Sequence, residues 1–125
     1  MPEYTITARE RPSWQFTAED FAEAIRKRWP NARVGIRDLP RSPMIVHALV
    51  PFEPPRRELG IALSSLGNAV ILDPADPDTA AEFVLWYVTQ LPEFDPPVYL
   101  FTDDMRSVEL RPDVTADEIV RTLTG

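Results

Sequence analysis

Residues 59–73 read LGIALSSLGNAVILD, and this stretch decides the fold. Apolar side chains alternate along residues 59–63, and a second apolar run begins at Ala69. Gly67 and Asn68 lie between the two runs, and they are residues that tight turns favour. Two short strands joined by a tight turn pair in antiparallel fashion. The stretch therefore predicts a β-hairpin within an antiparallel sheet.

Further strands are predicted on both sides of this hairpin. Each is a short run of alternating or β-branched residues bounded by proline, glycine or aspartate. They cover residues 33–37, 44–52, 98–102 and 108–110. Residues 4–7 form a further short strand or an extended segment, so residues 1–16 are expected to be either an arm or an edge strand.

Three helices are predicted from capping residues and helical periodicity. Thr17 and Thr115 each precede an acidic first turn, and apolar residues follow at three- and four-residue spacing. A middle helix covers residues 79–91, where apolar residues also recur. Pro30 and Pro92 end the first two helices, because proline disfavours helical backbone in the residue before it.

These elements follow the order (β)αββββαββα, which predicts an α+β fold. Hairpin signals and short connections favour an antiparallel sheet of about five to six strands, with the three helices on one face or at one end. We expect residues 1–125 to form a single domain, because this is the length of one ordinary domain and no linker or repeat interrupts the chain.

The composition is typical of a globular protein outside the membrane. Hydrophobic residues make up 44% of the chain and charged residues 26%. The longest apolar run, residues 83–88, is far shorter than the roughly 20 residues that span a bilayer. The N-terminus has no basic patch followed by an apolar stretch, so no signal peptide is predicted. We expect a cytoplasmic protein with no membrane partner.

The net charge of −7 is distributed unevenly. Residues 1–57 carry ten basic and seven acidic side chains, whereas residues 58–125 carry three basic and thirteen acidic ones. An acidic half repels phosphate backbones, so we expect no nucleic-acid partner. The same half suits a basic protein partner, and solubility alone is the other explanation of its charge.

Few of the residue types that carry chemistry are present. The chain has no cysteine, one histidine (His47) and four glycines, so thiolate chemistry, the usual zinc sites and glycine-rich phosphate loops are excluded. His47 lies mid-strand among apolar neighbours, where a structural histidine is more common than a general base. The sequence therefore favours a protein that is not an enzyme, with no catalytic residue, cofactor or metal.

One enzymatic alternative stays open. Asp73 and Asp76 follow the second strand of the hairpin and Asp103 follows another strand. Carboxylates at neighbouring strand ends can hold a divalent cation. Helix capping and turn formation explain the same aspartates without a metal. A metal-dependent enzyme using these three residues is thus the alternative to a non-enzymatic protein.

The helix at residues 79–91 is apolar nearly all round, and Trp86 is the large side chain that it directs away from the core. Trp86 is either covered by another element, such as the arm around Trp14 and Phe16, or is an exposed anchor for a partner. The predicted partner-binding residues are Trp86, Glu82, Gln90, Trp14, Asp103 and Asp104.

A second copy of the chain is a further candidate partner. Arg56 and Arg57 form a basic pair, which is complementary to the acidic loop at residues 73–78 of another copy. A structural or regulatory homodimer is therefore a third possible function.

Two resemblances extend these expectations. Residues 81–87 (AEFVLWY), then Pro92, then residues 108–112 (VELRP) and 115–119 (TADEI) resemble small bacterial proteins, some of which are immunity partners of secreted toxins. The order of elements resembles the secretion-chaperone-like fold, whose members are small, acidic, cytosolic and often dimeric. The strand at residues 69–73 is additional to that fold. Both resemblances imply a non-enzymatic module that sequesters or chaperones a protein partner.

Overall fold

The computed structural model describes residues 3–37 and 44–125, and these residues form seven strands and three helices. The strands are β1 Tyr4–Ala8, β2 Arg33–Ile36, β3 Met44–Val50, β4 Leu59–Ser64, β5 Val70–Leu72, β6 Val98–Thr102 and β7 Ser107–Leu110. The helices are α1 Ala18–Arg28, α2 Pro77–Gln90 and α3 Ala116–Thr124.

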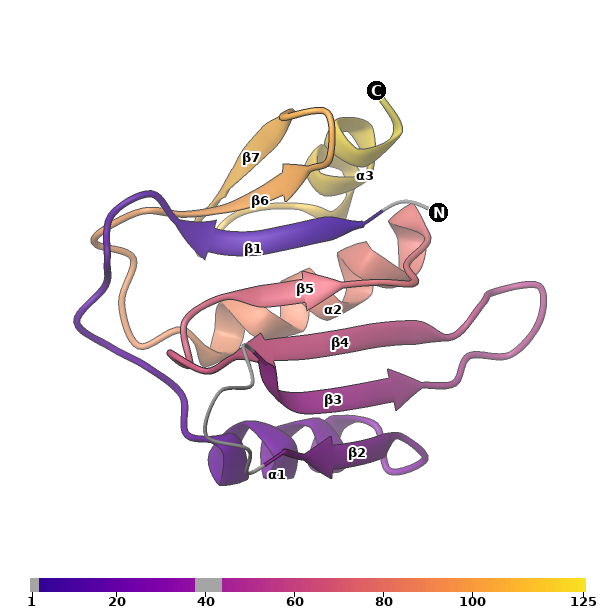
Figure 1. The fold of residues 1–125 in the computed structure, drawn as a ribbon. Coiled ribbons are helices and arrows are strands. Elements are labelled where there is room, and N and C mark those ends of the chain that lie inside the picture. Colours follow the sequence, from indigo (N-terminus) through magenta and orange to yellow (C-terminus); the bar gives the residue numbers. More distant parts are fainter. Residues whose placement is uncertain (1–2, 38–43) are drawn as a thin grey trace.

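The strands form one sheet in the order β2-β3-β4-β5-β1-β6-β7 (Figure 1). Every pairing between neighbours is antiparallel. The predicted α+β class and antiparallel sheet are therefore confirmed. The sheet is larger than the five to six strands expected, because the N-terminal segment is one of its strands.

The position of β1 differs from the sequence-based expectation of an arm or edge strand. β1 lies inside the sheet and pairs with both β5 and β6. Its inward side chains, Tyr4 and Ile6, are buried. Both pairing partners are distant in sequence, so residues 4–8 carry no local signal for a central position.

The predicted turn and capping residues form the local structure expected of them. Gly67 adopts a left-handed backbone (φ 74°) in the connection between β4 and β5. The hydroxyls of Thr17 and Thr115 accept hydrogen bonds from the backbone N–H groups of Asp20 and Glu118. These bonds cap α1 and α3, because the first N–H groups of a helix have no partner within it.

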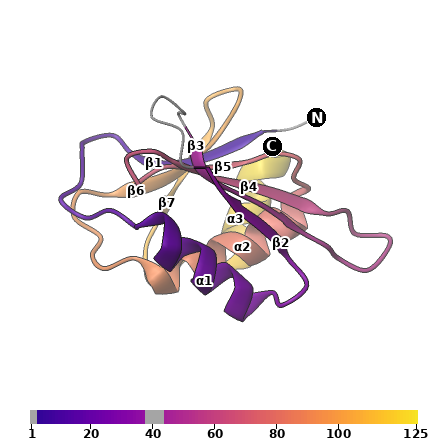
Figure 2. The ribbon, with the colours of Figure 1, turned by 60° about the horizontal axis from the view of Figure 1, so that its bottom comes forward.

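All three helices lie on one face of the sheet, with α2 between α1 and α3 (Figures 1 and 2). α1 packs on β2 and β3, whereas α3 packs on α2 and β7. α2 is the most apolar helix, and its Phe83, Val84 and Tyr87 have no exposed surface. None of the helices in the described part of the chain has the length and apolar character needed to cross a bilayer.

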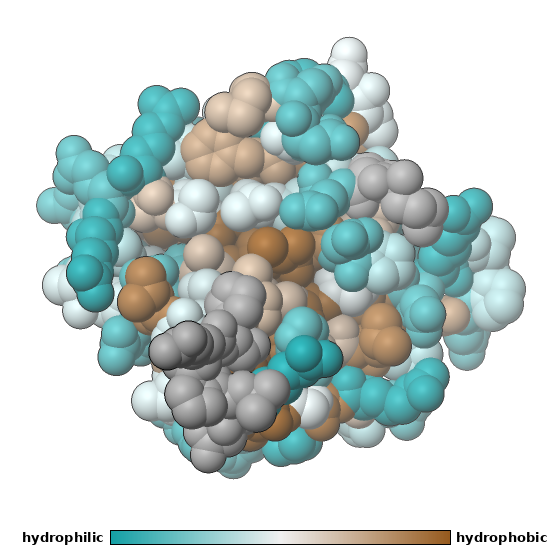
Figure 3. Space-filling view, viewed as in Figure 1, coloured by the Kyte–Doolittle hydropathy of each residue, from teal (hydrophilic) through white to brown (hydrophobic). Residues whose placement is uncertain are grey.

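The other face of the sheet has no helix over it among the described residues, and its centre is apolar (Figure 3). Strand alternation places Leu49, Ile71 and Phe101 on this face, and each is partly buried. The guanidinium of Arg9 lies 4.7 Å from the ring centroid of Tyr99, which is on the same face. We call this surface the open sheet face.

Candidate functional site

The facing surfaces of α1 and α2 form the candidate site. Asp20, near the start of α1, lines the same pocket as Gln90 at the end of α2. Arg28, at the end of α1, forms an ion pair of 3.8 Å with Glu82 in the middle of α2. The two helices therefore run antiparallel to each other.

Charge is segregated along α1. Its first turn contains Glu19 and Asp20, and its last turn contains Arg26, Lys27 and Arg28. This arrangement stabilises the helix, because its N-terminus carries partial positive charge and its C-terminus partial negative charge. It also gives the space beside α1 an acidic end and a basic end.

Seven aromatic side chains from α1, α2 and the segment before α1 form a cluster beside this space. Neighbouring ring centroids lie 5.1–5.9 Å apart. Trp86 meets Trp29, from the end of α1, edge-on at 5.1 Å, and it also meets Phe83. Trp86 is therefore partly buried, and α1 covers it on that side. The seven residues are Trp14, Phe16, Phe21, Trp29, Phe83, Trp86 and Tyr87.

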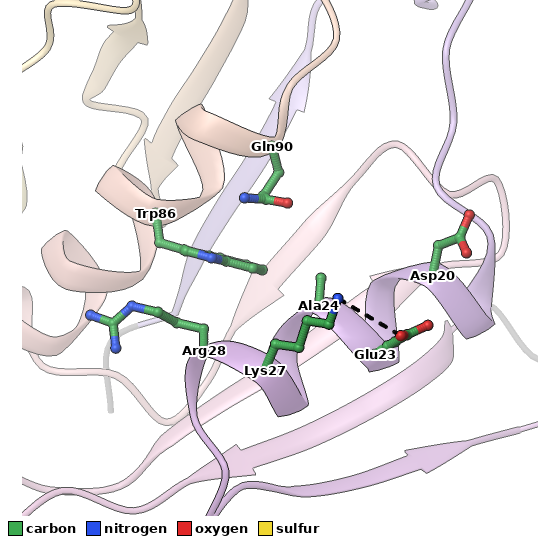
Figure 4. Close-up of a pocket in the computed structure, with 7 residues that line it drawn as sticks. All are labelled: Asp20, Glu23, Ala24, Lys27, Arg28, Trp86 and Gln90. Carbon is green, nitrogen blue, oxygen red and sulfur yellow. Dashed lines mark ion pairs between the residues drawn. The ribbon is translucent and has the colours of Figure 1, made fainter.

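An open groove of about 470 Å³ lies between α1 and α2. Trp86 extends from α2 towards α1, and the small side chain of Ala24 lies on the α1 side (Figure 4). We call this space the α1–α2 groove. It is lined by Asp20, Glu23, Ala24, Lys27, Arg28, Trp86 and Gln90.

A smaller pocket of about 230 Å³ adjoins the groove and shares four lining residues with it. Phe16, from the segment between β1 and α1, closes one side of it. A hydrogen bond of 2.7 Å from the Phe16 N–H to the carbonyl of Gly67 holds this segment in place. We call this space the Tyr87 pocket. It is lined by Phe16, Asp20, Phe21, Ala24, Trp86, Tyr87 and Gln90.

The hydroxyl of Tyr87 is an unusual feature of this pocket. It is buried and has no hydrogen-bond partner in the described part of the chain. Leaving a buried hydroxyl unpaired costs about 1–3 kcal/mol. Burial also raises the pKa of Tyr87, so the phenol stays neutral at physiological pH. Tyr87 thus lines the pocket as a residue, and its enclosed hydroxyl is a donor and acceptor without a partner among the described residues.

Four of the six predicted partner-binding residues lie in this region. Trp86 and Gln90 line the groove. Trp14 joins the aromatic cluster through Phe16, with ring centroids 5.5 Å apart. Glu82 lies one turn before Trp86, but it is engaged within the chain, because it pairs with Arg28 and with a second arginine described below.

The second partner of Glu82 is Arg56, from the connection between β3 and β4. The Arg56 guanidinium lies 3.1 Å from Glu82 and 3.1 Å from Asp78. It also lies 4.4 Å from the ring centroid of Phe52. Arg56 thus binds acidic residues of its own chain, so it offers no support for the predicted contact with a second copy.

The remaining two predicted residues, Asp103 and Asp104, lie in the turn between β6 and β7. This turn belongs to the opposite edge of the sheet from β2 and β3, on which α1 packs (Figure 1). Asp104 accepts hydrogen bonds from the hydroxyl of Thr102 and the guanidinium of Arg106. These bonds lower the pKa of the Asp104 carboxyl. The structure does not bring this pair to Trp86.

The aspartates of the metal-dependent alternative do not form a cluster. Within residues 3–37 and 44–125, no three acidic or histidine side chains converge closely enough to hold a metal. Asp76 is the N-cap of α2, and its N–H donates to the Thr79 hydroxyl at 3.2 Å. Asp103 and Asp76 lie near Tyr4, whose pKa is raised first by burial and then by these two charges. No observation favours a cation site here.

His47 lies on the open sheet face, in a hollow of about 420 Å³ that Asp73 also lines. Its Nε2 atom is buried without a hydrogen-bond partner among the described residues. Burial, and then the charge of Arg37, lowers the pKa of His47. The imidazole is therefore mostly neutral at physiological pH.

The sequence did not identify all the residues of the site. Asp20 and Tyr87 line the Tyr87 pocket, and neither is among the predicted partner-binding residues. The signal for Tyr87 was the residue type, since a tyrosine in an otherwise apolar core carries a hydroxyl that needs a partner. Asp20 had no such signal, because only the packing of α1 against α2 brings it to the pocket.

Comparison with models of protein families, with curated proteins and with solved structures finds no significant match for this chain. The function has to be inferred from the chemistry of the site.

Proposed function

We propose that this protein is a non-enzymatic module that binds a protein partner through the α1–α2 groove. The observation that carries the proposal is Trp86, a partly exposed tryptophan on the wall of an open groove. Tryptophan is enriched among the residues that dominate binding energy in protein interfaces, where polar residues surround it and exclude water. The charged side chains along α1 supply such a rim.

The groove is built to keep its shape. Trp29 and Phe83 hold the Trp86 ring from two sides. Glu82 pairs with arginines from α1 and from the connection between β3 and β4, so it links three segments. A binding surface that is already ordered loses little conformational entropy when a partner binds. This supports recognition of a partner at the groove.

The charge of the chain indicates the class of partner. The protein carries a net charge of −7, and thirteen of its acidic residues lie after residue 57. Such a field attracts basic proteins and accelerates their encounter. We propose that the module acts in the cytoplasm, where it sequesters or chaperones a basic protein chain, as an immunity protein does with a toxin domain.

A selection from a phage-displayed random peptide library tests this function. The immobilised protein is expected to enrich peptides with a shared motif, and Trp86→Ala is expected to lose them. Met105→Ala is the matched control, because Met105 is an apolar side chain that is 78% exposed in the turn between β6 and β7. Circular dichroism checks that both variants are folded.

Two results would contradict the proposal. If no motif is enriched by the unmodified protein, the groove is not a peptide-binding surface. If Trp86→Ala enriches the same peptides as the unmodified protein, they bind elsewhere, and the open sheet face is the next surface to test.

A further inference from the structure

We propose that the Tyr87 pocket binds a cation carried on an apolar stem, namely the side chain of a lysine or arginine of the partner. This inference rests on the proposed function and specifies which residue of the partner enters the groove. Three properties of the pocket carry it: aromatic walls, an unpaired carboxylate and a buried hydroxyl without a partner.

The walls of the pocket suit both parts of such a side chain. Phe16, Phe21 and Trp86 present aromatic surface to the pocket. An aliphatic stem gains from contact with these rings, because apolar surface leaves water. Aromatic faces also attract cations through their negative electrostatic potential. The aromatic walls therefore suit both the aliphatic stem and the charged group of a lysine or arginine side chain.

Asp20 is the acidic residue of the groove that has no ion-pair partner in the described part of the chain. Of the other acidic residues nearby, Glu23 lies 4.0 Å from Lys27, and Glu82 pairs with two arginines. The backbone N–H of Asp20 donates to the Thr17 hydroxyl, and among the described residues its carboxylate is left for an incoming charge. A cation in the pocket would meet this carboxylate, whereas an anion would be repelled by it.

The Tyr87 hydroxyl supplies the third contact. Its oxygen can accept a hydrogen bond from an ammonium or guanidinium N–H group. A purely apolar side chain in the pocket would leave this hydroxyl unpaired, as it is among the described residues now. A side chain that brings a donor is therefore favoured over one that does not.

The size of the pocket agrees with a single side chain. Its volume of about 230 Å³ is below the roughly 300–1,000 Å³ of pockets that enclose drug-sized ligands. Basic residues lie at the far end of the groove, with Lys27 and Arg28 about 10–12 Å along α1 from Asp20 at 1.5 Å per residue. These two basic residues pair with Glu23 and Glu82, so the end of the groove near Asp20 is the end that favours a cation.

Small probes of matched shape test the charge requirement. The probes are Nα-acetyl-lysine amide and Nα-acetyl-norleucine amide, which share a stem and differ in the ammonium group. Binding is followed by the indole N–H signals in ¹H–¹⁵N NMR spectra, with the Trp86 signal assigned from Trp86→Phe. We expect a saturable shift of that signal with the lysine probe, at millimolar concentrations, and about tenfold weaker binding of the norleucine probe.

Two variants test the contacts. Asp20→Asn is expected to weaken binding of the lysine probe about three- to tenfold and to leave binding of the norleucine probe unchanged. Glu19→Gln is the matched control, because Glu19 precedes Asp20 on α1 but does not line the pocket. Tyr87→Phe is expected to weaken binding of the lysine probe without unfolding the protein. Circular dichroism confirms the fold of each variant.

The results separate this inference from the proposed function. Equal binding of both probes, no binding of either, or equal effects of Asp20→Asn and Glu19→Gln would overturn the cation pocket. Peptides that depend on Trp86 but contain no lysine or arginine would also overturn it, while the proposed function would stand. Binding of the lysine probe without any peptide selected by the groove would support the pocket and remove the protein-binding function.

Discussion

Replacing Tyr87 by phenylalanine removes one oxygen atom from the core of the protein. The oxygen is buried and has no hydrogen-bond partner among the described residues, so its removal relieves a penalty of about 1–3 kcal/mol. The space it leaves, roughly 10–15 Å³, costs about 0.3 kcal/mol at 24 cal/mol per Å³. We therefore expect Tyr87→Phe to stabilise the protein by about 1 kcal/mol, and to raise its Tm by about 4 °C for a chain of 125 residues.

Urea denaturation followed by circular dichroism measures this difference. Tyr99→Phe is the control, because Tyr99 is only partly buried, on the open sheet face, and its free energy of unfolding should change by less than about 0.5 kcal/mol. A loss of more than about 1 kcal/mol on Tyr87→Phe would refute the reasoning, because it would show that the hydroxyl is hydrogen-bonded.

The same substitution has a signature at alkaline pH. Burial raises the pKa of Tyr87 above its ordinary value of 10.0. Above pH 10 the unfolded chain releases this proton more readily than the folded one, so stability falls as the pH rises. Tyr87→Phe is expected to lose less stability between pH 9 and 11 than the unmodified protein. Part of the loss of stability remains in the variant, because the pKa of Tyr4 is also raised. Identical stability–pH profiles of the variant and the unmodified protein would contradict the assigned burial of Tyr87.

Three further predictions concern other parts of the fold. Val84→Asp should unfold the protein, because an unpaired charge at a fully buried position costs more than about 4 kcal/mol. Trp86→Ala should cost about 1–3 kcal/mol and leave the circular dichroism spectrum native. An equal loss of stability in the two variants would place Trp86 in the core and contradict its role in an interface. Gly60→Ala should destabilise the protein by about 2 kcal/mol or more in urea denaturation, since its new Cβ would lie 2.1 Å from the carbonyl oxygen of Asp73; a neutral result would mean that the start of β4 shifts freely. Stability should fall as the pH drops below 6.5, because the folded state holds the His47 pKa below that value, and His47→Gln should reduce this fall; an unchanged pH profile in the variant would contradict it.

Local structure could be predicted from the sequence because its causes are local. The caps at Thr17 and Thr115 and the turn at Gly67 depend on residues close to them in the chain, and all three form as expected. The central place of β1 depends on pairing with β5 and β6, which no local pattern encodes. Long-range pairing is therefore where the sequence-based fold was incomplete.

The candidate site was predicted in part for the same reason. Helical periodicity directs Trp86 away from the core, but only the packing of α1 places Trp29 against it. The sequence grouped Glu82 with Asp103 by charge, whereas the fold pairs Glu82 with arginines of its own chain and puts Asp103 near the other edge of the sheet. Charge identifies candidate residues, and tertiary packing decides which of them remain available.

The location of β1 has a consequence for how the sheet opens. The strands β2 to β5 form one consecutive set and β6 with β7 forms another, and among the described strands only β1 hydrogen-bonds to both sets. Five residues thus join two subsheets into one cooperative unit. When β1 detaches, the edges of β5 and β6 are exposed together, and exposed strand edges pair readily with strands of other molecules. Detachment of this single strand therefore exposes two strand edges at once to other molecules.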